Sequence, residues 1–276
     1  MKTTRSNSLP IGVFDSGLGG LTVVRELLRR YPDEPIIYLG DNARVPYGTR
    51  SAATVERYAR NCAGFLLRQG LKMLVVACNT VSAVAIPAIR QMTDIPVLGV
   101  IEAGADAVSK SNAMRVGVIG TSGTIASGAY PLKIGELAPD CRVFQKATPL
   151  FVPLAEEGWI LGEVPRAVAR HYLESLVDDE IDLLLLGCTH YPLLIETIRT
   201  VLSDLESPAS VVDSATSMAD MVGRLLRKTG RVPSNPPLPP LDMLSCFVTD
   251  RPASFEEVAG RFLGADLGSI SQIDII

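Results

Sequence analysis

Two stretches of the sequence decide the fold: Leu74-Val75-Val76-Ala77-Cys78-Asn79-Thr80 and Leu184-Leu185-Leu186-Gly187-Cys188-Thr189-His190. Each is an apolar run that closes on a cysteine, followed by small polar residues and then a helix-like stretch. Runs that are apolar on both faces are typical of central strands in parallel sheets. Two such strands, each with a thiol at the same end, predict two similar halves that hold one small molecule between two sulfur atoms.

A second pair of segments repeats in the same order upstream of the cysteines. Ile11-Gly12-Val13-Phe14-Asp15-Ser16-Gly17 is similar to Val116-Gly117-Val118-Ile119-Gly120-Thr121-Ser122-Gly123. The interval from Gly12 to Cys78 nearly equals the interval from Gly117 to Cys188. Chance similarity of glycine-rich apolar strands is the alternative, but it does not account for the agreement of both intervals. A unit that recurs at a fixed spacing indicates an internal repeat.

Composition restricts the class of protein. The chain has 276 residues, of which 47% are hydrophobic, enough for one large or two modest domains. Five cysteines, an odd number, favour a reducing cytosol over a disulfide framework. Residues 1–10 lack the apolar core of a signal peptide, and no apolar stretch is long enough to span a membrane. The net charge of −4 gives no electrostatic support for nucleic-acid binding.

Strand-like apolar runs alternate with amphipathic segments along most of the chain, which is typical of α/β folds with parallel sheets covered by helices. In such sheets ligands bind beyond the carboxyl ends of the strands. Asp15, Cys78, Thr121 and Cys188 fall at such ends. The expected strands are 11–14, 36–39, 73–77, 97–100, 116–119, a segment near 143, 183–186, 210–212 and 243–249. The expected helices are 21–30, 54–69, 81–92, one from about 123, one near 153, 163–177, 192–202 and 254–263.

The two strand-end cysteines are the candidate reactive groups. A thiol at the start of a helix is close to unpaired backbone amides, and its pKa can fall from about 8.5 towards neutrality. A lone buried cysteine is more often a small hydrophobe, but the matched positions of this pair favour chemistry. The remaining cysteines are expected to have packing roles only: Cys62, Cys141 and Cys246.

The segment from Asp15 to Gly20 joins a strand to a helix, and its glycines allow backbone amides to face an anion. A phosphate-binding loop would require a lysine that is absent here, and the spacing is not that of a dinucleotide fold. We therefore expect Ser16 to donate to a carboxylate, and Asp15 to face an ammonium group or a proton path. A helix cap with a tight turn is the structural alternative.

Polar side chains follow both cysteines, and they can bind carboxylate or ammonium groups. His190 could assist proton transfer at Cys188. It could also be half of a zinc site, but two further ligands are missing nearby, and a chain with two histidines has no multi-histidine metal site. His171 is expected at the surface. The loop with Tyr47-Gly48 could close over a ligand, although proline-glycine loops are usually only turns.

Five motifs between Ile11 and Leu263 together match one family. They are Gly12–Gly20, Gly40-Asp41 with Pro46-Tyr47-Gly48, Ala77–Thr80, Gly117–Thr121 and Gly187–His190. In these motifs the chain resembles the cofactor-independent aspartate/glutamate racemase superfamily, and within it the enzymes of bacterial cell-wall synthesis. The resemblance implies interconversion of L- and D-glutamate at Cα without a cofactor, to supply peptidoglycan synthesis. It also implies a cytoplasmic homodimer with a small-molecule substrate and neither membrane nor nucleic-acid partners.

The family pattern gives each cysteine one face of the substrate. By resemblance, Cys78 would take the proton from D-glutamate and Cys188 from L-glutamate, with Asp15 and His190 as helpers of the two thiols. Glu156 matches a further auxiliary acid. The substrate-binding positions of the family correspond here to Asp15, Ser16, Tyr47, Gly48, Asn79, Thr80, Thr121, Thr189 and His190.

The chemistry of racemisation agrees with two thiols on opposite faces. Each sulfur would approach Cα at roughly 3–3.5 Å from its own side, so the two sulfur atoms would lie about 7 Å apart. A disulfide requires a sulfur–sulfur distance of about 2.05 Å. The pair should therefore remain a thiol and a thiolate. Lowering the barrier by roughly 8 kcal/mol or more requires more than a matched base. Amide donors on the carboxylate and exclusion of water are the expected further contributions.

The resemblance implies two α/β domains with mainly parallel sheets, related by a pseudo-two-fold axis, with the active site in the cleft between them. We expect the first domain to combine residues 1–99 with 209–276 and the second to cover 100–208. The proline-rich segment 231–240 is expected to be an extended surface connection rather than a docking motif. It looks longer than is usual in the family, and Asn42 stands where threonine is common.

Three other functions stay open from the sequence. A racemase for aspartate or another acidic amino acid is the nearest, because selectivity for side-chain length does not follow from the motifs. A two-lobed binding protein would bind glutamate without exchanging its Cα hydrogen. A transferase or hydrolase with one essential cysteine would form a covalent intermediate.

Overall fold

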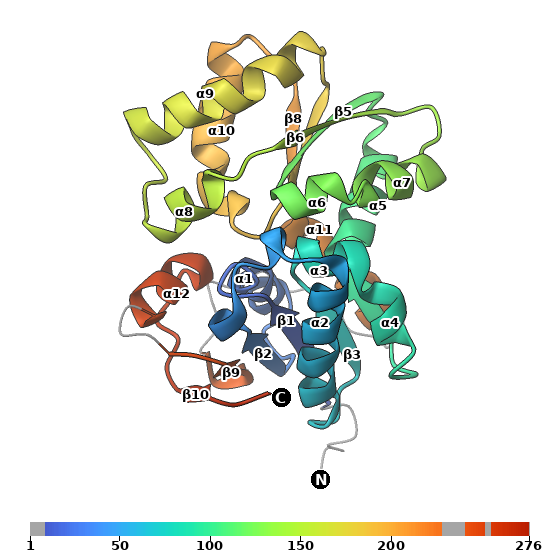
Figure 1. The fold of residues 1–276 in the computed structure, drawn as a ribbon, viewed down its shortest axis with the longest axis vertical. Coiled ribbons are helices and arrows are strands. Elements are labelled where there is room, and N and C mark those ends of the chain that lie inside the picture. Colours follow the sequence, from blue (N-terminus) through green and yellow to red (C-terminus); the bar gives the residue numbers. More distant parts are fainter. Residues whose placement is uncertain (1–8, 228–240, 252–254, 276) are drawn as a thin grey trace.

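The computed structural model describes residues 9–227, 241–251 and 255–275, which form two lobes (Figure 1). The first lobe is built on a six-stranded sheet and the second on a four-stranded sheet. Every pair of neighbouring strands in both sheets is parallel. The α/β class with parallel sheets in two similar halves, which the sequence predicts, is therefore confirmed.

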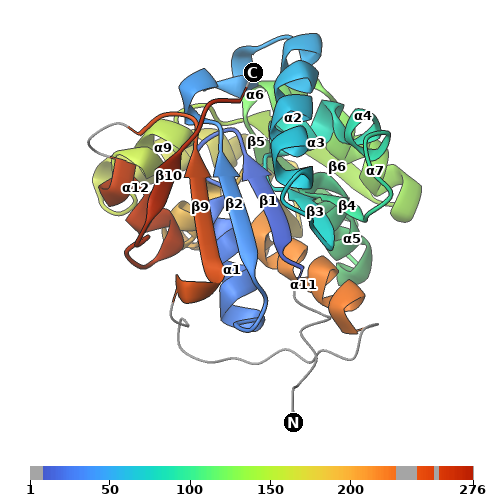
Figure 2. The same ribbon diagram turned by 90° about the horizontal axis from the view of Figure 1, so that it is seen from below.

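The sheet of the first lobe combines both ends of the chain. Its strand order is β10-β9-β2-β1-β3-β4, seen from below in Figure 2. The strands are β1 (Ile11–Asp15), β2 (Ile36–Gly40), β3 (Met73–Val76), β4 (Val97–Gly99), β9 (Leu244–Val248) and β10 (Ile270–Gln272). Since β9 pairs with β2 over the full length of both strands, the C-terminal part of the chain completes the sheet that the N-terminal part begins.

The sheet of the second lobe repeats the order of the first. Its order is β6-β5-β7-β8, which matches β2-β1-β3-β4 strand for strand. The strands are β5 (Arg115–Gly120), β6 (Arg142–Ala147), β7 (Leu183–Gly187) and β8 (Ser210–Asp213). Gly12 is opposite Leu74 and Gly117 is opposite Leu184, so the two sequence repeats have the same register.

Helices cover both sheets. The first lobe has α1 (Leu21–Arg30), α2 (Ala52–Leu67), α3 (Asn79–Val84), α4 (Ile86–Arg90) and α12 (Phe255–Leu263). The second has α6 (Ser122–Ala126), α7 (Ala129–Leu137), α8 (Phe151–Glu156), α9 (Glu163–Asp178) and α10 (Ile195–Asp204). Short 3-10 turns are η1 (Asn42–Arg44), η2 (Tyr47–Thr49), η3 (Tyr191–Leu194) and η4 (Leu241–Met243). None of the helices in these described ranges has the length and apolar character that a membrane-spanning helix needs.

Two helices, α5 (Val100–Ser111) and α11 (Ser214–Arg227), lie where the chain passes between the lobes. They pack against each other, and Arg224 of α11 forms an ion pair of 2.6 Å with Asp106 of α5. The sequence prediction lacks both. The apolar spacing of α11 was available as a signal, because Met218, Val222 and Leu226 recur at helical intervals and are buried.

The pairing of the strands places one segment in a different sheet from the one that the predicted domain boundaries imply. Strand β8 (Ser210–Asp213) pairs with β7 in the second sheet, although the predicted boundary at 208/209 places it with the first domain. By sheet membership, the chain returns to the first lobe after β8. The division into domains at 99 and 208 stays a prediction, and segment 231–240 lies outside the described residues.

Three predicted helices are divided or start later than expected. The helix expected over 81–92 is two helices, α3 and α4, that meet at Ala85, because Pro87 lacks the amide proton that would continue the hydrogen-bond pattern. The helix expected from about 123 is α6 followed by α7, with Gly128 between them at φ 64°. The helix expected from 192 begins as the 3-10 turn η3, and α10 starts at Ile195.

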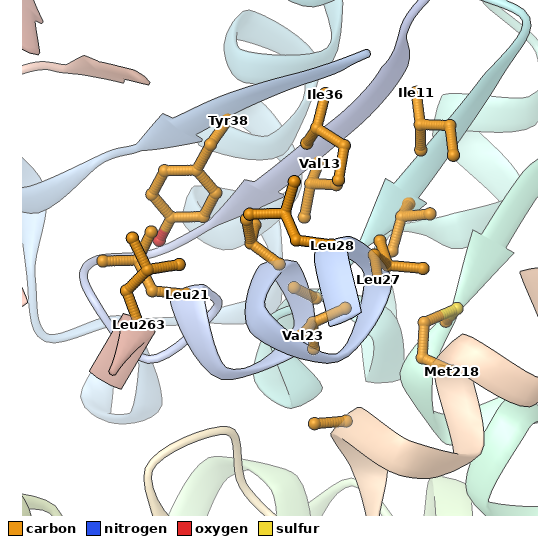
Figure 3. Packing of buried hydrophobic residues seen from close by; sticks show 14 of the residues in the cluster. Ile11, Val13, Leu21, Val23, Leu27, Leu28, Ile36, Tyr38, Met218 and Leu263 are labelled. Carbon is orange, nitrogen blue, oxygen red and sulfur yellow. The ribbon is translucent and has the colours of Figure 1, made fainter. Parts of the chain in front are cut away.

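The core of the first lobe fixes the loop that leads to the site. Leu21 and Leu28 of α1 point toward the strands β1 and β2, whereas Val23 lies on the side of α1 that faces α11 (Figure 3). All three side chains are fully buried. Met218 of α11 and Leu263 of α12 belong to the same cluster. Burial of each large aliphatic side chain contributes about 1.5–3 kcal/mol. With β1 and α1 both anchored in this way, the loop of residues 16–20 between them is held in place.

Candidate active site

A cavity of about 430 Å³ lies between the two lobes. Both lobes contribute to its wall, chiefly through loops at the carboxyl ends of β1, β3, β5 and β7, as expected for parallel sheets. The polar and thiol-bearing lining residues are Ser16, Tyr47, Thr49, Cys78, Asn79, Thr80, Thr121, Ser122, Glu156, Cys188, Thr189 and His190, with Gly17 and Gly48 beside them. The structure thus gathers almost all the predicted site residues around one space.

Cys78 lies between β3 and α3, as the N-cap residue of that helix. Its thiol is buried and donates to Ser16 Oγ at 3.4 Å. Burial raises the pKa of the Cys78 thiol to about 12, and the charge of Asp15 adds to the rise. Hydrogen bonds from Ser16 and from the Val81 amide lower the pKa, but by less. The expected fall towards neutrality is therefore wrong for Cys78, because desolvation exceeds the helix-terminus effect.

Cys188 follows β7 directly, but a 3-10 turn separates it from α10. The predicted helix start next to this thiol is therefore also wrong. Its neighbour is a side chain instead: Cys188 Sγ lies 3.8 Å from His190 Nδ1. The other ring nitrogen, Nε2, lies 3.0 Å from Glu156 Oε1. Thiol, imidazole and carboxylate thus form a chain along one wall of the cavity.

His190 is buried, and two neighbours favour its charged form. Burial lowers the pKa of His190, but the hydrogen bonds to Cys188 and Glu156 outweigh it and raise the value to about 10. The imidazole therefore carries a proton at neutral pH. Phe262 of α12 packs edge-on against this ring at 5.0 Å, and Arg261 donates to the Glu156 carbonyl at 2.5 Å. Neither Arg261 nor Phe262 was among the predicted site residues.

Asp15 lies behind the cavity wall and is not one of the lining residues. Its Oδ2 accepts from the Gly17 amide at 3.1 Å. Backbone hydrogen bonds from Ser16, Gly17 and Gly20 all lower its pKa, but burial raises the pKa by more, with the charge of His190 opposing it. The loop amides that the sequence predicts for a bound anion thus face the carboxylate of Asp15. Within the described ranges, Asp15 Oδ1 has no hydrogen-bond partner.

A buried carboxylate outside the cavity fixes Tyr47. The Tyr47 hydroxyl donates to Asp41 Oδ2, which also accepts from Arg44 Nε at 2.7 Å. Oδ1 of Asp41 accepts from Thr249 Oγ1 at 2.9 Å, at the end of β9. Cys62, predicted to have only a packing role, is a further donor to Asp41 Oδ2 at 3.7 Å. The loop that carries Tyr47-Gly48 is therefore held from behind by parts of the chain far apart in sequence.

Threonine hydroxyl groups at the cavity wall also connect the two lobes. Thr80 Oγ1 lies 3.1 Å from Thr121 Oγ1, and Thr121 lies 3.0 Å from Thr124 Oγ1. A further bridge runs from Thr22 Oγ1, in α1, to the Thr189 carbonyl at 2.9 Å. Thr22 and Thr124 were not predicted, because their role depends on contacts between segments distant in sequence.

The chemistry available here is acid–base chemistry at two thiols that line the same cavity. Neighbouring hydroxyl and amide groups can donate to carboxylates, and the cavity is large enough for a small amino acid. Among the residues that the structure describes, no three side chains of the His, Cys, Asp and Glu types are grouped as a metal site would require.

Comparison with known proteins gives consistent results over nearly the whole chain. The model of the Asp/Glu/Hydantoin racemase family matches residues 11–222. A glutamate racemase of Syntrophus aciditrophicus is 47% identical over 268 residues, which cover 96% of this chain and 97% of the relative. Similarity at this level supports the resemblance that the sequence motifs indicate.

Solved structures agree with the fold. A glutamate racemase of Francisella tularensis in complex with D-glutamate has a TM-score of 0.86 at 38% identity, covering 97% of this chain and 98% of that chain. Escherichia coli glutamate racemase, in complex with L-glutamate and the activator UDP-MurNAc-ala, has a TM-score of 0.76 at 28% identity. That match covers 97% of this chain and 99% of the other. The two-lobed architecture is therefore shared with these proteins.

Proposed function

The chain belongs to the Asp/Glu/Hydantoin racemase family, and from this premise we propose that it interconverts L- and D-glutamate by proton transfer between Cys78 and Cys188. It is an amino-acid racemase, an isomerase. The observation that carries the two-base mechanism is that both thiols line one cavity, each from a different lobe. A reaction that inverts Cα needs an acid on one face and a base on the other, and these roles exchange when the direction reverses.

The two thiols have different surroundings, and we assign them different partners. Cys78 acts on D-glutamate with the Ser16 hydroxyl at 3.4 Å, and Asp15 lies behind it. Cys188 acts on L-glutamate beside the protonated His190, which Glu156 orients.

Basicity and solvation suit the abstraction of a weakly acidic proton. A thiolate at Cys78 is a stronger base than an exposed thiolate, since burial has raised its pKa to about 12. General-base catalysis is most efficient when the pKa of the base lies near the operating pH, so with this pKa Cys78 is mostly the thiol, the acid form, at neutral pH. Bound substrate displaces water from the cavity, which strengthens the electrostatic interactions there.

Polar groups of both lobes hold the carboxylates of the substrate in this proposal. Asn79, Thr80 and Thr121 would donate on one side, and Thr189 and Ser16 on the other. Tyr47-Gly48 forms the rim, where Asp41 holds the loop. The D-glutamate formed would supply peptidoglycan synthesis in the cytoplasm, and we expect the enzyme to act as a homodimer.

Hydrogen exchange at Cα tests the mechanism. Cys78→Ser should abolish exchange of D-glutamate with deuterated water far more than that of L-glutamate, and Cys188→Ser should do the reverse. Each loss should be at least about a hundredfold, the range of a general acid–base contribution. Cys141→Ser is the matched control, because Cys141 is partly exposed and outside the cavity.

Other outcomes of the same experiment identify the alternatives. Normal exchange of both isomers in both variants would exclude the two-base mechanism. Binding of glutamate without any exchange in the unmodified protein would indicate a binding protein. Aspartate turnover that equals or exceeds glutamate turnover would overturn the choice of substrate.

A further inference from the structure

A buried tyrosine joins the two lobes next to the cavity. Tyr130 lies at the start of α7 in the second lobe and is fully buried. Its hydroxyl donates a hydrogen bond of 2.7 Å to Oδ1 of Asn79, the first residue of α3 in the first lobe. One bond therefore connects the helix that follows Cys78 to the lobe that carries Cys188.

Two glycines fix the ring of Tyr130. A Cβ atom at Gly187 would lie 2.8 Å from Tyr130 Cε2, and one at Gly104 would lie 3.1 Å from Cε1. Both edges of the ring thus contact backbone, that of β7 on one side and that of α5 on the other. Since Gly187 directly precedes Cys188, the strand end that carries this thiol also sets the position of the tyrosine hydroxyl.

The side-chain amide of Asn79 has a hydrogen-bond partner at its oxygen but none at its nitrogen among the described residues. Asn79 is 3% exposed and lines the cavity. Oδ1 accepts from Tyr130, whereas no acceptor lies within hydrogen-bond distance of Nδ2 among the described residues. Nearly all buried N–H groups in folded proteins have a partner, so an NH2 group left without one at a cavity wall indicates a ligand acceptor.

The direction of the hydrogen bond decides which end of the amide is free. Burial raises the pKa of Tyr130 above its usual value, and the charge of Cys188 adds to the rise, so the phenol keeps its proton. A buried hydroxyl with its proton needs an acceptor, and Oδ1 is the acceptor that the amide provides. The NH2 group is therefore the end that remains for another acceptor.

We propose that Tyr130 is a positioning residue: its hydroxyl fixes the Asn79 amide so that the NH2 group donates to a carboxylate of the substrate. This inference rests on the proposed function. Without the tyrosine hydroxyl, the amide is free to turn over and to present its oxygen, which repels a carboxylate. Tyr130 thus determines that this part of the wall recognises an anion.

Removal of one hydroxyl tests the proposal. Tyr130→Phe should raise KM for both isomers about three- to tenfold, the value of one hydrogen bond, with a much smaller change in kcat. Tyr191→Phe is the matched control, because Tyr191 is also fully buried in the second lobe and donates to the Thr148 carbonyl at 3.0 Å. Tyr191→Phe should lower the melting temperature by about as much as Tyr130→Phe does, but it should not raise KM.

A double-mutant cycle separates positioning from general structural damage. In an Asn79→Ala background, Tyr130→Phe should cause no further rise in KM. Asn79→Asp keeps an acceptor for Tyr130 but places an oxygen where the NH2 group was, so its KM should exceed that of Tyr130→Phe. The dissociation constant of D-glutamate, measured by calorimetry, should follow KM throughout.

The outcomes separate this inference from the proposed function. An unchanged KM in Tyr130→Phe, or an equal rise with and without Asn79, would overturn the positioning role while glutamate turnover by the unmodified enzyme still supports the racemase. Failure of the unmodified protein to exchange the Cα hydrogen contradicts the proposed function instead, and the calorimetric comparison then decides on Tyr130 alone. Loss of glutamate binding in every protein would overturn both.

Discussion

At the scale of single residues, the two cysteines occupy equivalent positions with different environments. Cys78 is paired with a serine hydroxyl, and Cys188 with an imidazole. The repeat in the sequence predicted the equivalence, because both thiols lie just beyond the carboxyl end of a strand, and the two strands pair in the same register. It could not predict the difference, because His190 and Glu156 meet only in the folded chain, across 34 positions of sequence.

The protonation of His190 gives a pH-dependent stability. Its pKa is raised from 6.5 to about 10, so the interactions with Cys188 and Glu156 favour the charged form. This stabilisation is complete below the unfolded pKa of 6.5 and is lost as the pH rises towards 10. Relative to the unmodified protein, His190→Asn should therefore lose most unfolding free energy near pH 6 and little near pH 10.

Urea unfolding at pH 6, 8 and 10 measures this difference. His171→Asn is the control for loss of an imidazole, since His171 is exposed on α9. A deficit for His190→Asn that is the same at all three pH values would contradict the raised pKa.

At the scale of elements, the lobes meet where helix ends and loops contact each other closely. The N-terminal turn of α6, in the second lobe, packs on η2, in the first. A Cβ atom at Gly123 would lie 2.6 Å from the Gly48 carbonyl, so glycine is required at this contact. The loop of Tyr47 is thus held between Asp41 behind it and α6 in front of it.

Gly123→Ala should displace this loop. The added methyl meets backbone that cannot rotate away, and overpacking of this kind costs about 1–3 kcal/mol. We expect a lower melting temperature and a raised KM for glutamate. Gly135→Ala is the control, because a Cβ there has no atom within 4 Å other than those of its chain neighbours and of its own helix backbone, and alanine in a helix should stabilise by about 0.5–1 kcal/mol. Equal behaviour of the two variants in both measurements would contradict the close contact.

Sequence patterns predicted elements better than they predicted contacts. Strands β1, β3 and β7 were expected because their apolar runs are local features. The helices α5 and α11 were missed, and α5 offers a weaker pattern because Ala103, Gly104 and Ala105 are small. Contacts such as Asp41 with Tyr47, or Tyr130 with Asn79, depend on how the lobes pack, which no local pattern records.

At the scale of the whole molecule, one ligand should couple the two lobes. A carboxylate ligand bound by groups of both lobes stabilises only the state in which both are folded. At about 100 times its dissociation constant, D-glutamate should add about 2.7 kcal/mol to the free energy of unfolding. For a chain of this size that corresponds to a rise of roughly 5–10 °C in melting temperature.

Calorimetric unfolding with and without D-glutamate checks this coupling. A single transition should move as a whole, and glycine, which lacks a second carboxylate, should move it less at the same concentration. Two transitions of which only one responds would mean that one lobe alone binds the ligand.

The pairing of β9 with β2 has a consequence for folding during translation. Translation delivers β2 early, but its outer neighbour begins only at Leu244. Until then, the nascent chain carries an open strand edge, to which another polypeptide can add. The four-stranded sheet is complete at Asp213 and can fold first. Chains truncated before Leu244 should consequently be prone to aggregation, and chaperones should be needed most during the interval before the last strands emerge.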